Sequence, residues 1–195
     1  MAEKNTSSVV GIDKFYYAIL NQDSEESVTY GEVTRVPYVQ NVSIEPEQEI
    51  AKAYGDNTVA EMAVSTGITT VELQFHAIPA EDRVKLLGLE EDEDGLTIQK
   101  SQINPPYVAV IFEQTKADGT SELIGLTKGM FTLPATENST KEDTLEFGSD
   151  TISGEFSARQ FDDIKQISAF IGATDESKRD KFMTKVFQKE EEPTP

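Results

Sequence analysis

The sequence contains no cysteine and no tryptophan, and it has only one histidine, His76, among 195 residues. Without cysteine the chain cannot form a disulfide, use a thiolate nucleophile or bind zinc through sulfur. One imidazole cannot supply a histidine pair to a metal, and neither a G-x-S-x-G nor an H-E-x-x-H motif occurs. We therefore expect no catalytic, cofactor-binding or metal-ligating residues.

Basic residues are also scarce, since 17 Lys and Arg stand against 36 Asp and Glu and give a net charge of −19. Such a balance repels phosphate backbones. No apolar run approaches the roughly 18 residues of a membrane span, and residues 1–8 lack the apolar region of a secretory signal. We expect neither nucleic-acid binding nor membrane insertion, and synthesis in the cytoplasm.

The composition is that of a folded globular protein, with 37% hydrophobic and 27% charged residues. A chain of this length can bury one sizeable core. The organisation expected is an N-terminal arm at 1–13, a β domain at 14–160 and a C-terminal extension at 161–195. The extension is expected to be partly helical, and the tail after Lys189 to be disordered.

Most of the β domain has the composition or the alternation of β-strands. The aromatic segment 15–20 suits a strand packed on both faces, and an acidic loop is expected after it. Turn-forming residues at 55–57 predict a long hairpin over 38–67 with a polar, weakly apolar surface. Asp118-Gly119 predicts a second hairpin over 105–134, and 144–159 forms another alternating stretch.

The lone histidine lies where a strand is expected to give way to a helix. In 69–77 the apolar residues share one face, so His76 points to the wetter side and is read as a strand-end residue. Pro79 suits the first helical position and Gly88 the C-terminal cap of a short helix. Its apolar stripe is expected to contain Val84 and Leu87. The apolar face of 69–77 consists of Val71, Leu73, Phe75 and Ala77.

The acidic segment 90–95 begins like a calcium-binding loop. The twelfth position of such a loop would fall on Ser101, where a bidentate Glu is required. A solvated turn is the better interpretation. The 36 carboxylates also permit a glycosidase-like hydrolase hypothesis, but the sequence cannot place two carboxylates at the roughly 5–10 Å that this mechanism needs.

The last segment has a different period. Ile164, Ile167 and Ile171 suggest a helical stripe, although a strand over 165–171 remains open. Thr174 is placed to cap a final helix. The apolar side of that helix is expected to contain Phe182, Met183, Val186 and Phe187.

A β domain without a chemical centre must cover its sheet edges, blunt them or pair them with another chain. If an edge pairs with the opposite edge of an identical copy, the contact is heterologous and closes into a ring when the rotation allows. The sequence also carries several segments in a familiar order: "TRVPYVQNVSIEP", "YGDN", "ITTVELQF" followed by "RVKLLGL", "PPYVAVIFEQ", "TKGMFTLP" and "DTISGEFSAR".

In these segments the chain resembles the major tail protein family, the tail tube proteins of long-tailed, non-contractile phages of Gram-positive bacteria. The resemblance covers roughly residues 10–160, and 160–195 corresponds only to a variable extension. It implies a mainly β (α+β) fold, a tail-tube β-sandwich or half-barrel with a flanking helix at 79–88 and a helical C-terminal extension. It also implies a structural virion protein that is not an enzyme and needs no cofactor.

The implied assembly is a stack of hexameric rings that forms the tube through which DNA leaves the virion. The implied partners are other copies of the chain, the tape measure, tail terminator and distal tail proteins, and DNA that passes without specific binding. The 38–67 hairpin would line the lumen or reach an adjacent subunit, and the two terminal segments would join rings. The implied location is the phage tail, with host cytoplasm during assembly.

Two further interpretations remain open. The strand pattern would also suit another virion or surface β-sandwich module, such as a capsid decoration protein or a carbohydrate-binding adhesin. The excess of acids has two readings as well. An acidic bore would let DNA slide because it offers phosphates no counterion-releasing partner, whereas acidic residues also keep an assembling subunit soluble.

Overall fold

The computed structural model describes residues 7–56, 58–134, 148–172 and 175–188. Thr174 and the tail after Lys189, for which the sequence predicted a helix cap and disorder, lie outside these residues. The strands and helices in chain order are β1 (Val9–Asp23), β2 (Val28–Tyr30), β3 (Thr34–Val36), β4 (Val39–Gly55), β5 (Thr58–Phe75), α1 (Ala80–Leu87), β6 (Glu90–Glu91), β7 (Thr97–Ile98), β8 (Val108–Lys116), β9 (Ser121–Thr132), β10 (Asp150–Ser157), β11 (Gln166–Ile171) and α2 (Glu176–Phe187).

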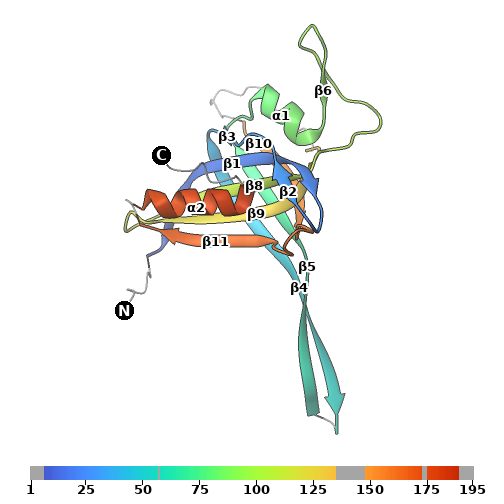
Figure 1. Ribbon diagram of the computed structural model, residues 1–195, viewed down its shortest axis with the longest axis vertical. Coiled ribbons are helices and arrows are strands. Elements are labelled where there is room, and N and C mark those ends of the chain that lie inside the picture. The colour runs from blue at the N-terminus through green and yellow to red at the C-terminus, as the bar shows by residue number, and fades with distance from the viewer. Residues whose placement is uncertain (1–6, 57, 135–147, 173–174, 189–195) are drawn as a thin grey trace, which may run out of the picture.

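One antiparallel sheet forms the body, with strand order β2-β1-β8-β9-β10-β5-β4. β3 adds to β1 and β11 adds to β9, while β6 and β7 form a separate small ribbon. The sheet does not close. The β4–β5 hairpin projects from one end of the body, and α1 with the β6–β7 ribbon lies at the other end (Figure 1). The prediction of a mainly β fold with a flanking helix is confirmed.

Both predicted hairpins form, and their turns use the expected residues. Gly119 has φ 81° in the β8–β9 turn, and Asp56 has φ 47° at the β4–β5 turn. Two strand predictions need correction. The segment 69–77 is no separate strand, because β5 runs without a break from Thr58 to Phe75. The expected acidic loop after 15–20 is a short hairpin instead, since β1 continues to Asp23 and pairs with β2.

The strand-to-helix junction follows the prediction with a shift of one residue. β5 ends at Phe75, and His76 is exposed. Ala77, predicted on the buried face, is exposed as well because the chain has already left the sheet there. Pro79 precedes the first turn of α1 as its N-cap rather than occupying the first helical position. Gly88 ends the helix with φ 65°, a conformation that favours glycine.

The sheet buries hydrophobic side chains on both faces. The first core cluster contains Phe15 and Tyr17 of β1 and is covered at one end of the body by Leu86 and Leu87 of α1. The second cluster contains Ala18 and lies under α2. The prediction that 15–20 packs on both faces is therefore confirmed. The α2 residues in the second cluster are Phe182, Val186 and Phe187, with Met183 packed against them.

The open choice for 165–171 is decided in favour of the strand. β11 pairs with β9 from Gln166 opposite Leu126 to Ile171 opposite Ser121. Its alternate residues Ile167, Ala169 and Ile171 pack under α2, so the isoleucine spacing serves a strand and not a helical stripe. The final helix forms, but its N-cap is Asp175, one residue after the predicted Thr174, and the Asp175 carboxylate accepts a hydrogen bond from the Lys178 N–H.

Two arginines fix α2 to the sheet. Arg159 is 1% exposed and donates bidentately to Asp162, with both N···O distances at 2.7 Å. It also donates to the carbonyls of Val186 and Lys185 at the C-terminal end of α2, where cations favour the helix dipole. Nearer the other end, Arg179 donates bidentately to the buried Glu113 of β8 at 2.5 Å.

Glu113 is one of the groups through which pH acts on this attachment. Burial acts to raise the pKa of Glu113, but hydrogen bonds and charges from Arg179 and Lys14 outweigh it and lower the pKa to about 2. A carboxylate with a lowered folded pKa stabilises the protein above its unfolded pKa. That stabilisation is lost as pH falls from the unfolded toward the folded value.

We predict that Glu113→Gln lowers the free energy of unfolding by about 2 kcal/mol at neutral pH, because it removes charge-assisted hydrogen bonds. The difference from the parent should shrink as pH falls below about 5 and become small as pH passes through about 2. Urea unfolding at several pH values measures it. The exposed carboxylate of Glu155 serves as control, and Glu155→Gln should leave the unfolding curve almost unchanged. A Glu113→Gln deficit that persists at pH 2 would contradict the assignment.

Candidate functional site

Inside the fold, the described residues contain no cluster of three or more His, Cys, Asp or Glu side chains that could hold a metal ion. The backbone N–H of His76 donates to the Tyr38 carbonyl, and its side chain lies at the surface. Neither α1 nor α2, the helices of the described ranges, has the length and apolar character needed to cross a membrane. The surface is therefore where a functional site has to be sought.

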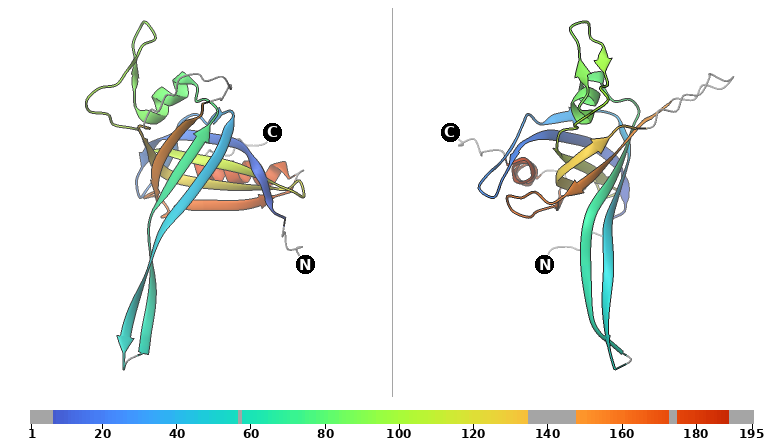
Figure 2. Two further views of the ribbon diagram at one scale, coloured as in Figure 1. Left: turned by 180° about the vertical axis from the view of Figure 1, so that it is seen from behind. Right: turned by 90° about the vertical axis from the view of Figure 1, so that its right-hand side faces the viewer.

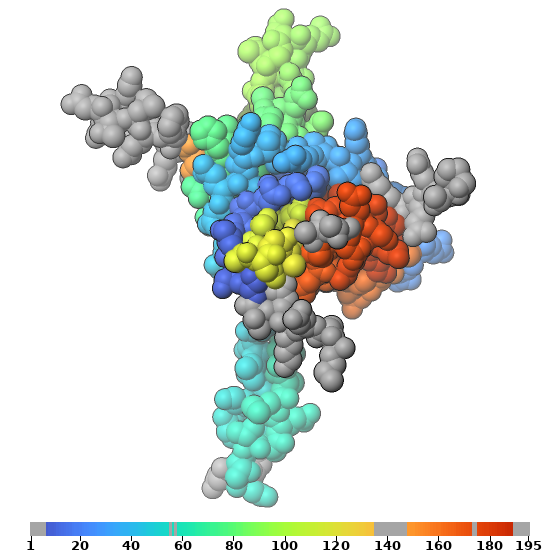
Figure 3. Space-filling model, turned by 90° about the vertical axis from the view of Figure 1, so that its left-hand side faces the viewer, coloured from blue at the N-terminus to red at the C-terminus, as the bar shows by residue number. Residues whose placement is uncertain are grey.

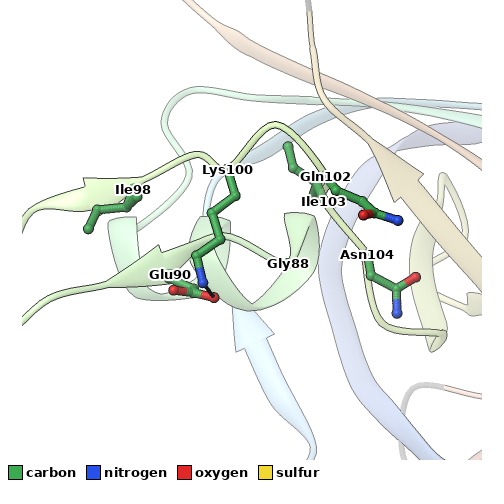
Figure 4. A pocket seen from close by; sticks show the side chains of 7 residues that line it. All are labelled: Gly88, Glu90, Ile98, Lys100, Gln102, Ile103 and Asn104. Carbon is green, nitrogen blue, oxygen red and sulfur yellow. Dashed lines mark hydrogen bonds and ion pairs between the residues drawn. The ribbon is translucent and has the colours of Figure 1, made fainter.

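A shallow hollow beside the β6–β7 ribbon contains one ion pair, between Lys100 Nζ and Glu90 Oε1 at 2.5 Å (Figure 4). Its other labelled side chains are apolar or amides, without a nucleophile and a base in contact. In the adjoining acidic turn Asp92 Oδ1 accepts from the N–H groups of Asp94 and Leu96. This carboxylate holds its own turn together, as a solvated Asx turn does.

The β4–β5 hairpin is exposed over most of its length. Residues 45–54, 56 and 58–68 all lie at the surface, and Figure 3 shows the hairpin standing clear of the body. It nevertheless carries large apolar side chains with 39% to 71% of their surface exposed. Clusters of exposed apolar side chains mark interaction sites in soluble proteins. The exposed apolar side chains of the hairpin are those of Ile50, Tyr54, Val59, Met62, Val64 and Ile68.

The strand register places five of these side chains on one face. Directly paired residues in an antiparallel ladder share a face, and the pairs here are Ile50 with Val64, Lys52 with Met62 and Tyr54 with Val59. We call Ile50, Tyr54, Val59, Met62 and Val64 the apolar face of the hairpin. Beyond Val42, both bulges in this pairing place their extra residue on β5, so the side chains of β4 alternate without interruption. Ile50 and Tyr54 therefore lie on the same face of β4 as the core residues Val42 and Ile44.

The opposite face of the hairpin is acidic and otherwise small. Glu45, Glu47 and Glu49 alternate along β4, and Glu61 stands opposite Ala53. A Cβ on Gly67 would meet the Glu47 side chain, which places both residues on this side. We call Glu45, Glu47, Glu49 and Glu61 the acidic face. A hairpin with one apolar and one acidic face is suited to a contact in which its apolar face packs against apolar surface and its acidic face meets basic side chains.

The sequence-based description of this hairpin as polar and weakly apolar was incomplete. It counted the residues correctly but did not assign them to faces. The assignment depends on two bulges on β5, at 59–61 and 66–69, which shift the pairing by one residue each. Ile50 and Tyr54 at even positions of one strand were the available signal.

The main sheet leaves several strand edges open within the described ranges, and two of them belong to β4 and β11. β4 is the last strand of the sheet path and pairs there only with β5, and β11 pairs only with β9. Edges of this kind present unpaired N–H and C=O groups that recruit other chains. The hairpin and these edges together make up the candidate assembly surface.

A family model described as phage tail tube protein matches residues 41–195. A search of curated proteins gave no match. The matched region includes the whole β4–β5 hairpin except its first residues. It also runs through 160–195, the part for which the sequence resemblance had offered only a variable extension.

Two valines of β5 allow a matched test of the exposed hairpin. Val64 is 63% exposed and Val71 is completely buried. We predict that Val71→Ala lowers the free energy of unfolding by about 2 kcal/mol or more, whereas Val64→Ala changes it by less than about 0.5 kcal/mol. Urea unfolding of the dilute monomer measures both. A large loss for Val64→Ala would mean that the hairpin side chains pack within the subunit.

Proposed function

The chain belongs to the phage tail tube protein family, and from this premise we propose that it assembles into hexameric rings that stack into the tail tube. The protein is a structural component of the phage tail and not an enzyme. In the proposal each subunit contributes its open sheet edges and its projecting hairpin to contacts with other copies. The resulting tube is the conduit through which DNA leaves the virion.

The apolar face of the hairpin is the observation that carries the proposal. Five large apolar side chains on this two-stranded projection keep 46% to 71% of their surface exposed, and that exposed surface adds no burial to the isolated subunit. Burying apolar surface is worth about 25 cal/mol per Å². A second copy that covers this face therefore gains stability that the free subunit lacks.

The arrangement of the projections supports a heterologous contact. The hairpin leaves one end of the body and the α1 and β6–β7 region lies at the other end (Figure 2). The surfaces that two neighbouring copies present to each other therefore differ. Repeated contacts of this kind generate rings when the rotation closes and open stacks when it does not, and a tube of stacked rings needs both.

The net charge of −19 supports passage of DNA without binding. A bore of the same sign as the phosphates offers DNA no counterion-releasing contact, so the duplex slides. The same charge keeps the unassembled subunit soluble in the host cytoplasm. A reconstructed tube with a bore lined mostly by Lys and Arg would contradict the sliding role and leave the solubility role intact.

The further partners proposed are those a tail tube meets at its ends and inside: the tape measure, tail terminator and distal tail proteins. We place the protein in a long, non-contractile tail of a phage that infects a Gram-positive host. The N-terminal arm and the C-terminal segment are proposed to contribute contacts between rings. A capsid decoration protein or an adhesin module would share the strand pattern but not the tail tube family.

We predict that Ile50→Ser combined with Val64→Ser prevents tube formation while the subunit stays folded. The reason is that both changes fall on the apolar face. The matched control is Ala51→Ser combined with Ala63→Ser, a cross-strand pair on the opposite face. Electron microscopy of concentrated protein, with circular dichroism of the monomer, measures both outcomes.

The position and copy number of the protein in purified virions complete the test. A high copy number confined to tails is expected. Rings or tubes formed equally well by the apolar-face variant would remove the hairpin from the mechanism, and a protein absent from tails would refute the function itself.

A further inference from the structure

The open edge of β11 exists because the hairpin leaves the sheet. Two strands share one edge of β9. β10 pairs with its Lys128–Thr132 portion and β11 with its Ser121–Leu126 portion, so β10 and β11 lie end to end along that edge. β5 covers β10 from Thr69 to Phe75. Below Thr69 it departs as the hairpin, and no described strand takes its place beside β11 (Figure 1).

We propose that the outer edge of β11 receives the β4–β5 hairpin of a second copy of the chain. In the neighbour, the hairpin then occupies the position beside β11 that β5 leaves empty where it departs from the sheet. This inference rests on the proposed self-assembly and names the acceptor for it. The outer edge of β11 and the hairpin both carry backbone groups that pair with no further described strand, and pairing such groups is the usual way in which exposed sheet edges associate.

The apolar faces of the two partners match. On β11 Phe170 is 49% exposed and Ser168 is exposed beside it, on the side away from α2. Ser168 stands opposite Ile124, which packs against the first core cluster. The apolar face of the hairpin continues the face of this same cluster along β4. A neighbouring hairpin paired with β11 therefore lays its apolar face next to Phe170 and Ile124.

The charged faces match in the same orientation. Lys178, Lys181 and Lys185 follow one stripe of α2 at i, i+3 and i+7, and all three are exposed. Lys178 Nζ reaches the Phe170 carbonyl, so this stripe begins on the β11 side of the helix. With its apolar face toward the first cluster, the docked hairpin turns its acidic face toward these lysines. Such complementarity sets specificity and orientation more than affinity.

The edge of β11 is also guarded in the free subunit. The Lys178 ammonium occupies the Phe170 carbonyl, and Lys116 Nζ lies 4.1 Å from the centre of the Phe170 ring. Lysines at a strand edge are a common device against untimely pairing. The base of the subunit's own hairpin contacts the start of this region, where Lys165 Nζ donates to the Gly67 carbonyl. Beyond that base the described hairpin residues lie at the surface, where another copy can reach them.

Disulfide trapping tests the contact directly, because the chain has no cysteine of its own. Ser168→Cys is mixed with single-cysteine hairpin variants, and tubes are assembled under reducing conditions and then oxidised. Mixing single variants restricts the disulfide to different copies. The hairpin positions sample about 13 Å of each strand on the apolar face. They are Gln48, Ile50 and Lys52 on β4 and Met62, Val64 and Thr66 on β5.

The expected result is a disulfide-linked heterodimer from at least one hairpin position, formed in tubes and at least tenfold less in dilute monomers. Ser101→Cys, an exposed serine at the other end of the body, is the matched control and should not cross-link to the hairpin. Tubes that form but give no Ser168 cross-link, or give as much with Ser101, overturn the inference and leave the proposed function standing. Failure of the parent protein to form tubes, together with its absence from tails, removes both.

Charge reversal provides a second readout that does not depend on Ser168. Reversing Glu45, Glu47 and Glu49 to Lys, or Lys178, Lys181 and Lys185 to Glu, should each slow assembly at least tenfold. The chain with both sets reversed keeps the parent's net charge and should regain most of the parent's rate. Glu90, Glu91 and Glu93 reversed to Lys serve as the charge control. If the double reversal assembles no better than either single reversal, the inference is wrong.

Discussion

The departure of β5 from the sheet at Thr69 is the constraint on which the rest of this structure depends. Above that point β5 lies between β10 and β4 and helps to close the first core cluster. Below it, β4 remains its partner to the tip, so the hairpin satisfies half of its own backbone groups and can project into solvent. The same departure exposes an apolar face on the hairpin, and within the described ranges β11 then pairs with β9 alone. One bend in the strand path thus creates both a donor surface and an acceptor edge.

The second core cluster makes the acceptor edge rigid. α2 covers the side of β11 that carries Ile167 and Ile171, and buried Arg159 and Glu113 tie the helix to the sheet at its two ends. Each arginine uses its planar fork to hold a carboxylate in two places, which a lysine could not do. A strand edge that is held in place in this way loses little entropy when another chain pairs with it.

A protein of this kind needs no pocket to have a function. Membership of the tail tube family agrees with the properties of the subunit: an acidic surface, unpaired edges and a long amphipathic projection. In the proposed assembly the edges and the projection serve association between copies, while the acidic surface serves solubility and the passage of DNA. The buried charges of Glu113 and Arg159 hold elements of the fold together. Apolar surface that is exposed in the subunit becomes buried between the proposed neighbours.

The sequence by itself determined the local elements, because turn residues such as Asp118-Gly119 and the alternation around Val71 act over a few residues. It also determined the acidic balance and the absence of thiol and histidine chemistry. Whether 165–171 became a strand or a helix was decided by the free edge of β9, which is distant in sequence. The two faces of the hairpin were decided by bulges that only the paired register reveals. Strand partners and register arise from contacts between residues far apart in the chain, so only the tertiary structure could show where this subunit remains incomplete.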